Sequence, residues 1–377
     1  MKIAVLKDAA GPEARVAATP DTVRSYVGDG HAVTVVKGAG KAADFRDAAY
    51  SDAGASLAAS NTAAVKSADL VLSVTGGTAK LLGAMPRGAA ITGLLSPTDN
   101  PKYVDAAAKA GVTAIALEWI PRISRAQSMD VLSSQSNLSG YRAVVEGAGL
   151  YGRALPMMMT AAGTIAPAKL FIMGVGVAGL QAIATARRLG AVTTATDVRP
   201  ATKEQVASLG AKFIAVENDE FREAETSGGY AKQMSEDYQR QQAELVASHI
   251  AKQDIVVTTA LIPGRDAPVL VTNSMLDTMK PGSVLVDLAV ERGGNVEGSK
   301  PGEIVTTRNG VHIVGYLNWP SRMASDASNM FARNLKALLP LLTADDGRFA
   351  PDWDDEVIKG AALTRDGAVV NERLLSK

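Results

Sequence analysis

The stretch Ala168-Lys-Leu-Phe-Ile-Met-Gly-Val-Gly-Val-Ala-Gly179 places a glycine-rich turn directly after an apolar run. Leu180–Leu189 holds no helix breaker and predicts a helix, and Val192-Thr-Thr-Ala-Thr-Asp197 predicts a second strand ending on a carboxylate. Strand, glycine turn, helix, strand and acid, in this order, indicate a dinucleotide-binding α/β unit. The glycines allow a tight turn, close approach of a pyrophosphate and close helix–strand packing, while the helix N-terminus attracts the anion.

The composition limits the classes of protein that fit this chain. At 377 residues it is long enough for two or three domains, and 47% hydrophobic residues can fill their cores. The formal net charge of zero gives no electrostatic reason to expect nucleic acid. No cysteine is present, and three scattered histidines offer no metal-binding spacing, so we expect no metal site.

No segment predicts a membrane span or a signal peptide. Met1–Asp8 carries only a short apolar run, which predicts a first strand. The most apolar tract, 154–186, is interrupted by Pro156, Gly163, Pro167 and Lys169. We therefore expect a cytoplasmic protein, with peripheral attachment to a membrane partner left open.

Short β-branched runs alternate with alanine-rich helical stretches along most of the chain, a pattern that predicts parallel sheets with helices on both faces. The long helical stretch 135–152 separates two sets of strands, and 325–340 predicts a helix that returns to the first set. We expect two Rossmann-like doubly wound domains, 1–131 plus 322–377 and 132–321, with a ligand cleft between them. The predicted strands are 2–6, 32–36, 69–74, 90–94, 112–117, 168–173, 191–196, 212–216, 254–259, 283–288 and 311–315.

Asp197 predicts which dinucleotide binds. A carboxylate at this strand end can accept hydrogen bonds from both adenosine ribose hydroxyls and would repel a 2′-phosphate, which favours NAD(H) over NADP(H). Arg199 complicates this, because a nearby arginine can accept the phosphate; stacking on adenine or simple solvation are the alternatives. The predicted cofactor contacts around the turn are Gly174, Gly176, Val177, Ala178, Gly179, Asp197, Val198 and Arg199.

Residues 121–142 form a second informative segment, unusually dense in polar side chains. One interpretation is a solvated loop followed by a helix that Ser133 or Ser136 caps. The other is a binding loop, because loops at the carboxyl ends of α/β strands build sites. Arg122, Gln127, Asp130 and Ser133 have the polar groups to hold a carboxamide or a ribose.

These segments resemble one known family. Residues 121–145 and 169–216 are similar to the NAD(H)-binding component, domain I, of proton-translocating nicotinamide nucleotide transhydrogenase. Met157–Gly163 matches too, and Thr226–Met234 resembles the loop that closes on bound nucleotide. The resemblance spans nearly the whole chain and is weakest over roughly 40–90 and the last thirty residues.

The resemblance implies roles for particular residues. Arg122, Asp130 and Ser133 would hold the nicotinamide end, and Gln127 would reach toward a second nucleotide and align the two rings. Gly229 and Tyr230 would lie at the tip of the closing loop, with Gln242 and Leu261 as secondary contacts. Thr259 and Ala260, after a predicted strand, could lie along the cofactor or form an ordinary turn.

The implied activity is half of a reaction. The chain would present NADH for direct hydride transfer to NADP⁺, and the NADP(H) would lie on a partner subunit. Membrane-spanning subunits would couple the transfer to proton translocation across the inner membrane, and the chain itself would be a homodimer. Alone it should bind NAD(H) and catalyse no net reaction.

Two other functions compete with this one. The fold resembles alanine dehydrogenase, and Arg15 matches that family's substrate-binding arginine. Its substrate lysine and catalytic histidine, however, would fall near Thr75 and Leu95, which can neither bind a carboxylate as lysine does nor transfer a proton. A non-catalytic NAD(H) sensor that signals through 223–240 is the third possibility. The intact Arg122–Ser133 constellation argues against a sensor.

Overall fold

The computed structural model describes residues 1–8, 11–223, 234–262 and 264–375. It divides into two compact units, unit 1 (Met1–Gln135 with Pro320–Lys377) and unit 2 (Ser136–Trp319). The chain passes from unit 1 to unit 2 within helix α6 (Val131–Leu150), and it returns to unit 1 at Pro320. The limits expected from the sequence, 1–131 with 322–377 and 132–321, remain our proposal for the domains.

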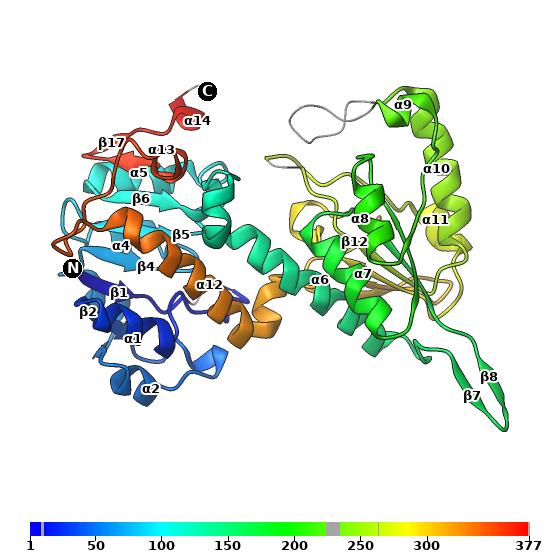
Figure 1. Ribbon diagram of the computed structural model, residues 1–377, viewed down its shortest axis with the longest axis horizontal. Helices are drawn as coiled ribbons and strands as arrows, with labels where there is room; N and C mark the ends of the chain where they lie inside the picture. The colour runs from blue at the N-terminus through cyan, green and yellow to red at the C-terminus, as the bar shows by residue number, and fades with distance from the viewer. Residues whose placement is uncertain (9–10, 224–233, 263, 376–377) are drawn as a thin grey trace. The chain divides into compact units, whose positions relative to one another are not determined.

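Unit 1 contains a six-stranded, entirely parallel sheet (Figure 1). Its first strand is central and the chain winds outward in both directions, which is the doubly wound order of a Rossmann fold. In spatial order the strands are β3 (Ser56–Ala58), β2 (Ala32–Val36), β1 (Lys2–Val5), β4 (Leu70–Leu72), β5 (Ala90–Gly93) and β6 (Thr113–Ala116). The helices are α1 (Pro20–Gly28), α2 (Asp47–Asp52), α3 (Asn61–Val65), α4 (Ala79–Leu82), α5 (Pro101–Ala110), α12 (Ala324–Leu338), α13 (Glu356–Ala361) and α14 (Glu372–Leu375).

Unit 2 repeats this strand order and adds one antiparallel edge strand. Its sheet runs β11 (Lys212–Phe213), β10 (Val192–Thr196), β9 (Lys169–Met173), β12 (Ile255–Thr258), β13 (Val284–Asp287), β15 (His312–Val314) and β14 (Ile304–Thr306). Among the described strands of this sheet, β14 alone is antiparallel to its neighbour. The helices of unit 2 are α7 (Val177–Arg188), α8 (Thr202–Ser208), α9 (Asp219–Arg222), α10 (Glu236–Ile250) and α11 (Asn273–Thr278).

Alternation along β9 shows how unit 2 buries both faces of its sheet. Leu170 and Ile172 belong to a core shared with α6, α7 and α8, whereas Phe171 and Met173 belong to a core shared with α10 and α11. Side chains alternate between faces along a strand, so a strand covered on both sides is apolar throughout. The doubly wound fold predicted from the sequence is confirmed.

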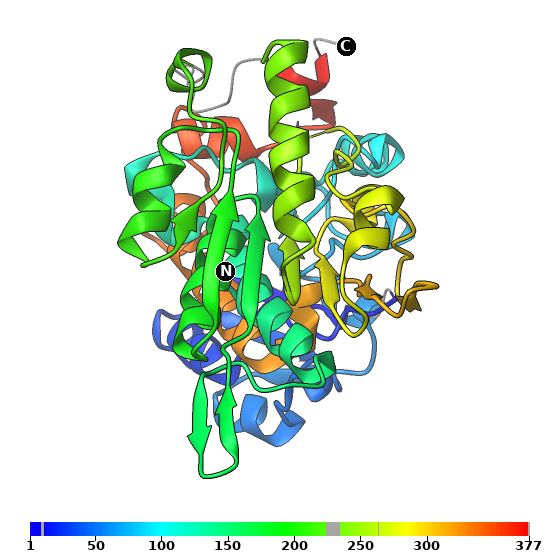
Figure 2. The same cartoon turned by 90° about the vertical axis from the view of Figure 1, so that its right-hand side faces the viewer.

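Several short elements were not predicted. These are the edge strands β3 and β14, the pair β16 (Thr364–Arg365) and β17 (Ala368–Val369), and the hairpin β7 (Met158–Thr160) and β8 (Gly163–Ile165). Strand β3 pairs in parallel within the sheet of unit 1, and β14 pairs antiparallel at the edge of the sheet of unit 2, whereas β16–β17 and β7–β8 form separate antiparallel pairs. Figure 2 shows the hairpin extending beyond the end of its own unit's sheet.

Candidate functional site

The glycine turn lies at the carboxyl end of β9, between β10 and β12, where the strand order of unit 2 reverses. Gly174 has φ +103°, a conformation that side chains disfavour, and an added Cβ would lie 2.6 Å from Thr259 Oγ1. A Cβ on Gly179 would lie 1.9 Å from the Gly174 carbonyl oxygen. These two glycines are therefore required by close packing inside the protein itself.

Gly176 differs from these two glycines because nothing in the described protein crowds it. It is the N-cap residue of α7, no side chain caps this helix, and a Cβ added to it would meet no described heavy atom within 4 Å. The N–H groups of the first turn of α7 thus face open space with the positive end of the helix dipole. This open cradle fits a pyrophosphate group.

The segment after β12 is tied to the glycine turn. Thr259 Oγ1 donates a 2.9 Å hydrogen bond to the Gly174 oxygen. The Asn295 amide both accepts from the Ala260 N–H at 3.0 Å and donates to the Ala260 oxygen at 2.9 Å. Asn295 is itself held by Asp287, at the end of β13, which accepts from the Asn295 N–H. Sequence reasoning missed Asn295; an asparagine following a strand-ending acid was its only signal.

Asp197 follows β10, as predicted, but its carboxylate is already engaged. It accepts a 2.7 Å hydrogen bond from the Val175 N–H and hydrogen bonds from the Arg199 backbone and guanidinium. Arg199 also donates to the Val175 oxygen. Arg199 is thus not simply solvated, and it partly neutralises the charge expected to repel a 2′-phosphate.

Apolar side chains surround this end of unit 2. Val198 is 60% exposed and Leu261 is 56% exposed, and Val177 is also exposed. Exposed apolar groups beside a polar cradle are typical of ligand sites. Gln242, in contrast, is used structurally, because its amide donates to Thr196 Oγ1 and accepts from the Val216 N–H. Gly229 and Tyr230 lie outside the described residues.

The polar loop lies in unit 1, after β6. Arg122 and Gln127 are exposed, and within the described residues neither side chain makes a hydrogen bond or ion pair; the Gln127 backbone oxygen accepts from the Asp130 N–H. Asp130 and Ser133 instead contact each other: Asp130 accepts from the Ser133 N–H at 2.9 Å and from its hydroxyl at 2.5 Å. The loop therefore presents two free donors beside one internal pair.

This pair corrects the predicted helix cap. Helix α6 begins at Val131, so Asp130 occupies the N-cap position and satisfies the N–H of the third helical residue. Neither Ser133 nor Ser136 caps the helix. Asp130 and Ser133 thus have a structural role that stands beside any role in binding.

The positions that would serve an amino-acid dehydrogenase are occupied by other contacts. The Thr75 N–H and hydroxyl both donate to Asp8, and a Cβ on Gly76 would lie 2.4 Å from Leu95 Cδ2. Arg15 forms a buried ion pair with Glu13 at 2.7 Å and donates to Gln135. The chain's three histidines lie elsewhere, with His31 beside the N-terminal amine, His249 beside Thr194 and His312 beside Thr306.

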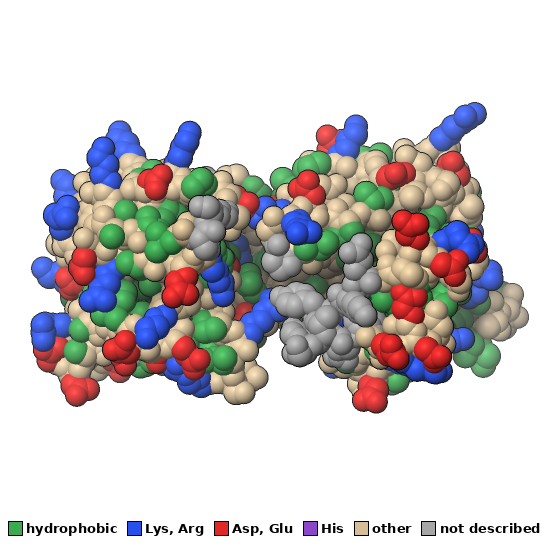
Figure 3. Space-filling model, turned by 90° about the horizontal axis from the view of Figure 1, so that it is seen from above, with side chains coloured by type: hydrophobic (Ala, Val, Ile, Leu, Met, Phe, Trp, Pro, Cys, Tyr) green, Lys and Arg blue, Asp and Glu red, His purple; other side chains and the backbone are tan. Residues whose placement is uncertain are grey.

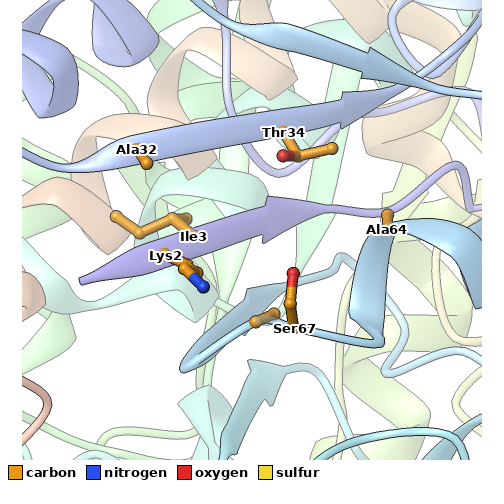
Figure 4. Close-up of a pocket in the computed structure, with 7 residues that line it drawn as sticks. Lys2, Ile3, Ala32, Thr34, Ala64 and Ser67 are labelled. Atoms are coloured by element: carbon orange, nitrogen blue, oxygen red, sulfur yellow. The ribbon is translucent and has the colours of Figure 1, made fainter.

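Other features of the described chain do not suggest a site. A pocket of about 230 Å³ is lined by residues that include Lys2, Ala32 and Ser67 (Figure 4). It lies near the amino ends of β1 and β2, whereas ligand sites of α/β folds lie at the carboxyl ends of strands. Acidic and basic side chains intermingle on the face in Figure 3. Among the described residues there is no cluster suited to a metal and no helix long and apolar enough to cross a membrane.

Comparison with known families assigns the chain to one of them. The N-terminal domain of the alanine dehydrogenase/PNT family matches residues 4–139, and its C-terminal domain matches 143–372. The chain belongs to this family. The C-terminal match continues into residues 320–372, which fold as part of unit 1.

Within the family, the chain shares about half of its residues with transhydrogenase components. It is 51% identical to the first part of NAD(P) transhydrogenase subunit alpha of Rhodospirillum rubrum, over 99% of both chains. A crystal structure of transhydrogenase from Sinorhizobium meliloti is 51% identical, with a TM-score of 0.89 over 98% of this chain and 100% of that one. Alanine dehydrogenase of Halomonas elongata is 30% identical over 97% of this chain and 94% of its own.

Proposed function

We propose that this chain is the NAD(H)-binding subunit of a proton-translocating NAD(P) transhydrogenase. It presents NADH for hydride transfer to NADP⁺ on a partner subunit. The observation that carries this proposal is the open cradle at Gly176, which lacks any capping side chain, in a chain 51% identical to a transhydrogenase subunit.

Unit 2 supplies the binding part of the mechanism. The first turn of α7 receives the pyrophosphate, and Val198 and Leu261 offer apolar contact. The two hydrogen bonds between Asn295 and Ala260 hold the segment after β12 in one conformation, in which it approaches the cofactor. Asp197 receives the adenosine ribose while Arg199 orients the carboxylate.

Unit 1 supplies orientation. The nicotinamide provides the hydride, so the protein needs no acid or base at the reacting carbon. Arg122 and Gln127 have uncommitted donors, and we assign the nicotinamide carboxamide to Arg122 and alignment with the second nucleotide to Gln127. The Asp130–Ser133 pair fixes the end of their loop.

The partners in this proposal are an NADP(H)-binding subunit and membrane-spanning subunits, through which the chain attaches peripherally to the inner membrane from the cytoplasm. A second copy of the chain is also proposed. The hairpin β7–β8 exposes Met157, Met158, Met159 and Ile165, and no charged residue occurs between Arg153 and Lys169. An isolated two-stranded hairpin with uncharged edges is marginally stable in water, and two copies can pair symmetrically.

A stopped-flow assay tests the function. The chain is mixed with the separately purified NADP(H)-binding subunit, NADH and an oxidised NADP analogue with a distinct absorbance. We expect rapid reduction of the analogue that requires both proteins. No transfer with both proteins present, or equal transfer without this chain, would contradict the proposal. Light scattering of the wild type and Met159→Lys tests the homodimer, with a monomer expected for the variant.

A further inference from the structure

We infer that Arg125 is a positioning residue for Gln127, held by a carboxylate clamp on helix α13; this rests on the proposed function. Arg125 lies in the 3-10 segment Ser124–Met129, two residues before Gln127. Its guanidinium donates to both oxygens of Asp355, at 2.8 and 2.9 Å, and twice to Glu356 Oε1, at 3.3 and 3.2 Å.

The geometry of this clamp differs from that of an ordinary surface ion pair. Isolated exposed pairs contribute little, but a bidentate arginine–carboxylate pair fixes direction as well as distance. Asp355 is mostly buried and also caps α13 by accepting from the Val357 N–H. Hydrogen bonds from Arg125 lower the pKa of Asp355, so the clamp is charged at neutral pH.

Two more contacts hold the same loop from the same C-terminal segment. Asn334, on α12, donates to the Ser128 oxygen at 2.7 Å and accepts from the Ser134 hydroxyl at 2.7 Å. Gly360, on α13, packs so closely that an added Cβ would lie 3.1 Å from Pro121 Cδ. The C-terminal segment therefore contacts the loop before, within and after its exposed residues.

The polar side chains of the loop fall into two groups, those that bind other parts of the protein and those that remain available to a ligand. The Arg125 guanidinium makes four hydrogen bonds, whereas the side chains of Arg122 and Gln127, on either side of it, make none within the described parts of the chain. A free amide at the tip of a short segment can align a substrate only if the backbone beneath it is fixed. The clamp fixes that backbone.

The test is a double-mutant cycle in the stopped-flow assay, with the two subunits mixed as above. The variants are Arg125→Met, Gln127→Asn and the double variant; Arg24→Met, which breaks the exposed Arg24–Asp21 pair of α1, is the matched control. We expect Arg125→Met to lower the transfer rate about tenfold, since small misplacements of aligning groups cost this much or more. The NADH dissociation constant and the control's rate should stay within about twofold of wild type.

The cycle separates positioning from general stability. If Arg125 acts through Gln127, the double variant should be no slower than Gln127→Asn alone. Arg125→Lys should recover part of the rate, because it retains the charge but not the bidentate geometry. Multiplicative losses, an unchanged rate in Arg125→Met, or an equal loss in Arg24→Met would overturn the inference.

A second variant covers the case in which Arg125→Met fails to fold. Asp355→Asn keeps an N-cap acceptor for α13 but removes the charge that holds the guanidinium. It should fold and show a similar loss of rate; a wild-type rate would overturn the inference. A wild-type chain that transfers no hydride contradicts the proposed function instead.

Discussion

The two units share one strand order but differ at the carboxyl ends of their sheets. In unit 2, β9 leads through Gly174–Gly176 directly into α7, whose N-terminus is open. In unit 1, residues 6–19 separate β1 from α1, and Asp8 within them already accepts from Ser73, Val74 and Thr75. The same fold thus leaves unpaired donors where it can bind an anion and satisfies them internally where it cannot. The binding function of a unit therefore depends on the residues at the ends of its strands and not on the strand order, which the two units share.

The largest expected effect concerns the buried pair of unit 1. Burial alone would raise the pKa of Glu13, but hydrogen bonds and charge from Arg15 hold it below its ordinary value. Removing one partner of such a pair costs about 3–5 kcal/mol, so Arg15→Met should melt roughly 10 °C lower at pH 7.5. If Arg15 were instead a free substrate-binding group, this variant would melt like the wild type.

The difference in melting temperature between the wild type and Arg15→Met should depend on pH, and the pKa of Glu13 sets the direction of this dependence. In the wild type, the depressed pKa of Glu13 adds stability above the unfolded value, and this is lost as pH falls through the folded pKa. In Arg15→Met the buried carboxyl has a raised pKa, so its cost grows as pH rises. The difference in melting temperature should therefore shrink between pH 7.5 and about pH 4.5, near the unfolded pKa of glutamate. An equal difference in melting temperature at both pH values would contradict this explanation.

The next effect separates binding from folding in unit 2. Gly176→Ala should melt like the wild type, because its Cβ meets no described protein atom within 4 Å. It should nevertheless bind NADH on the order of 100-fold more weakly, because the methyl group occupies the path of the pyrophosphate. Gly149→Ala, also uncrowded, is the matched control and should bind normally. Calorimetric titration of both variants measures the difference.

The smallest effect concerns the choice of nucleotide. Arg199 partly neutralises Asp197, so Arg199→Met should leave a stronger negative charge beside the ribose site. Rejection of NADPH relative to NADH should then increase, by about 1 kcal/mol or roughly fivefold for one charge at screened distances. An unchanged or weaker rejection of NADPH would contradict this prediction, because Arg199 would then not offset the charge of Asp197 at the ribose site. Competition binding measures the ratio.

Much of the fold was predictable because strong local patterns coincide with the sheets. Buried runs such as Leu170–Met173 are apolar throughout, and each predicted strand of the two sheets has a counterpart in the structure. The missed strands are short: β3 and β14 lie at sheet edges, where half-exposed residues give no clear periodicity. Their pairing depends on neighbours distant in sequence, which local patterns do not reveal.

The site was only partly predictable for a related reason. The glycine turn is a local motif, and Asp197 follows its strand as the motif requires. The partners of side chains are not local: Asn295 reaches Ala260, Arg125 reaches Asp355, and Asp130 rather than a serine caps α6. The roles of Arg122, Gln127, Tyr230 and the other proposed contacts remain predictions.

Of the two sheets with one topology, we expect only the sheet of unit 2, with its open glycine turn, to bind the pyrophosphate of a nucleotide. Calorimetric titration of the wild-type chain with NADH, and separately with NADPH, tests it most directly. We predict one NADH per chain, no comparable NADPH binding, and loss of the NADH signal in Gly176→Ala. Two NADH per chain, equal affinity for NADPH, or unchanged binding in Gly176→Ala would contradict it.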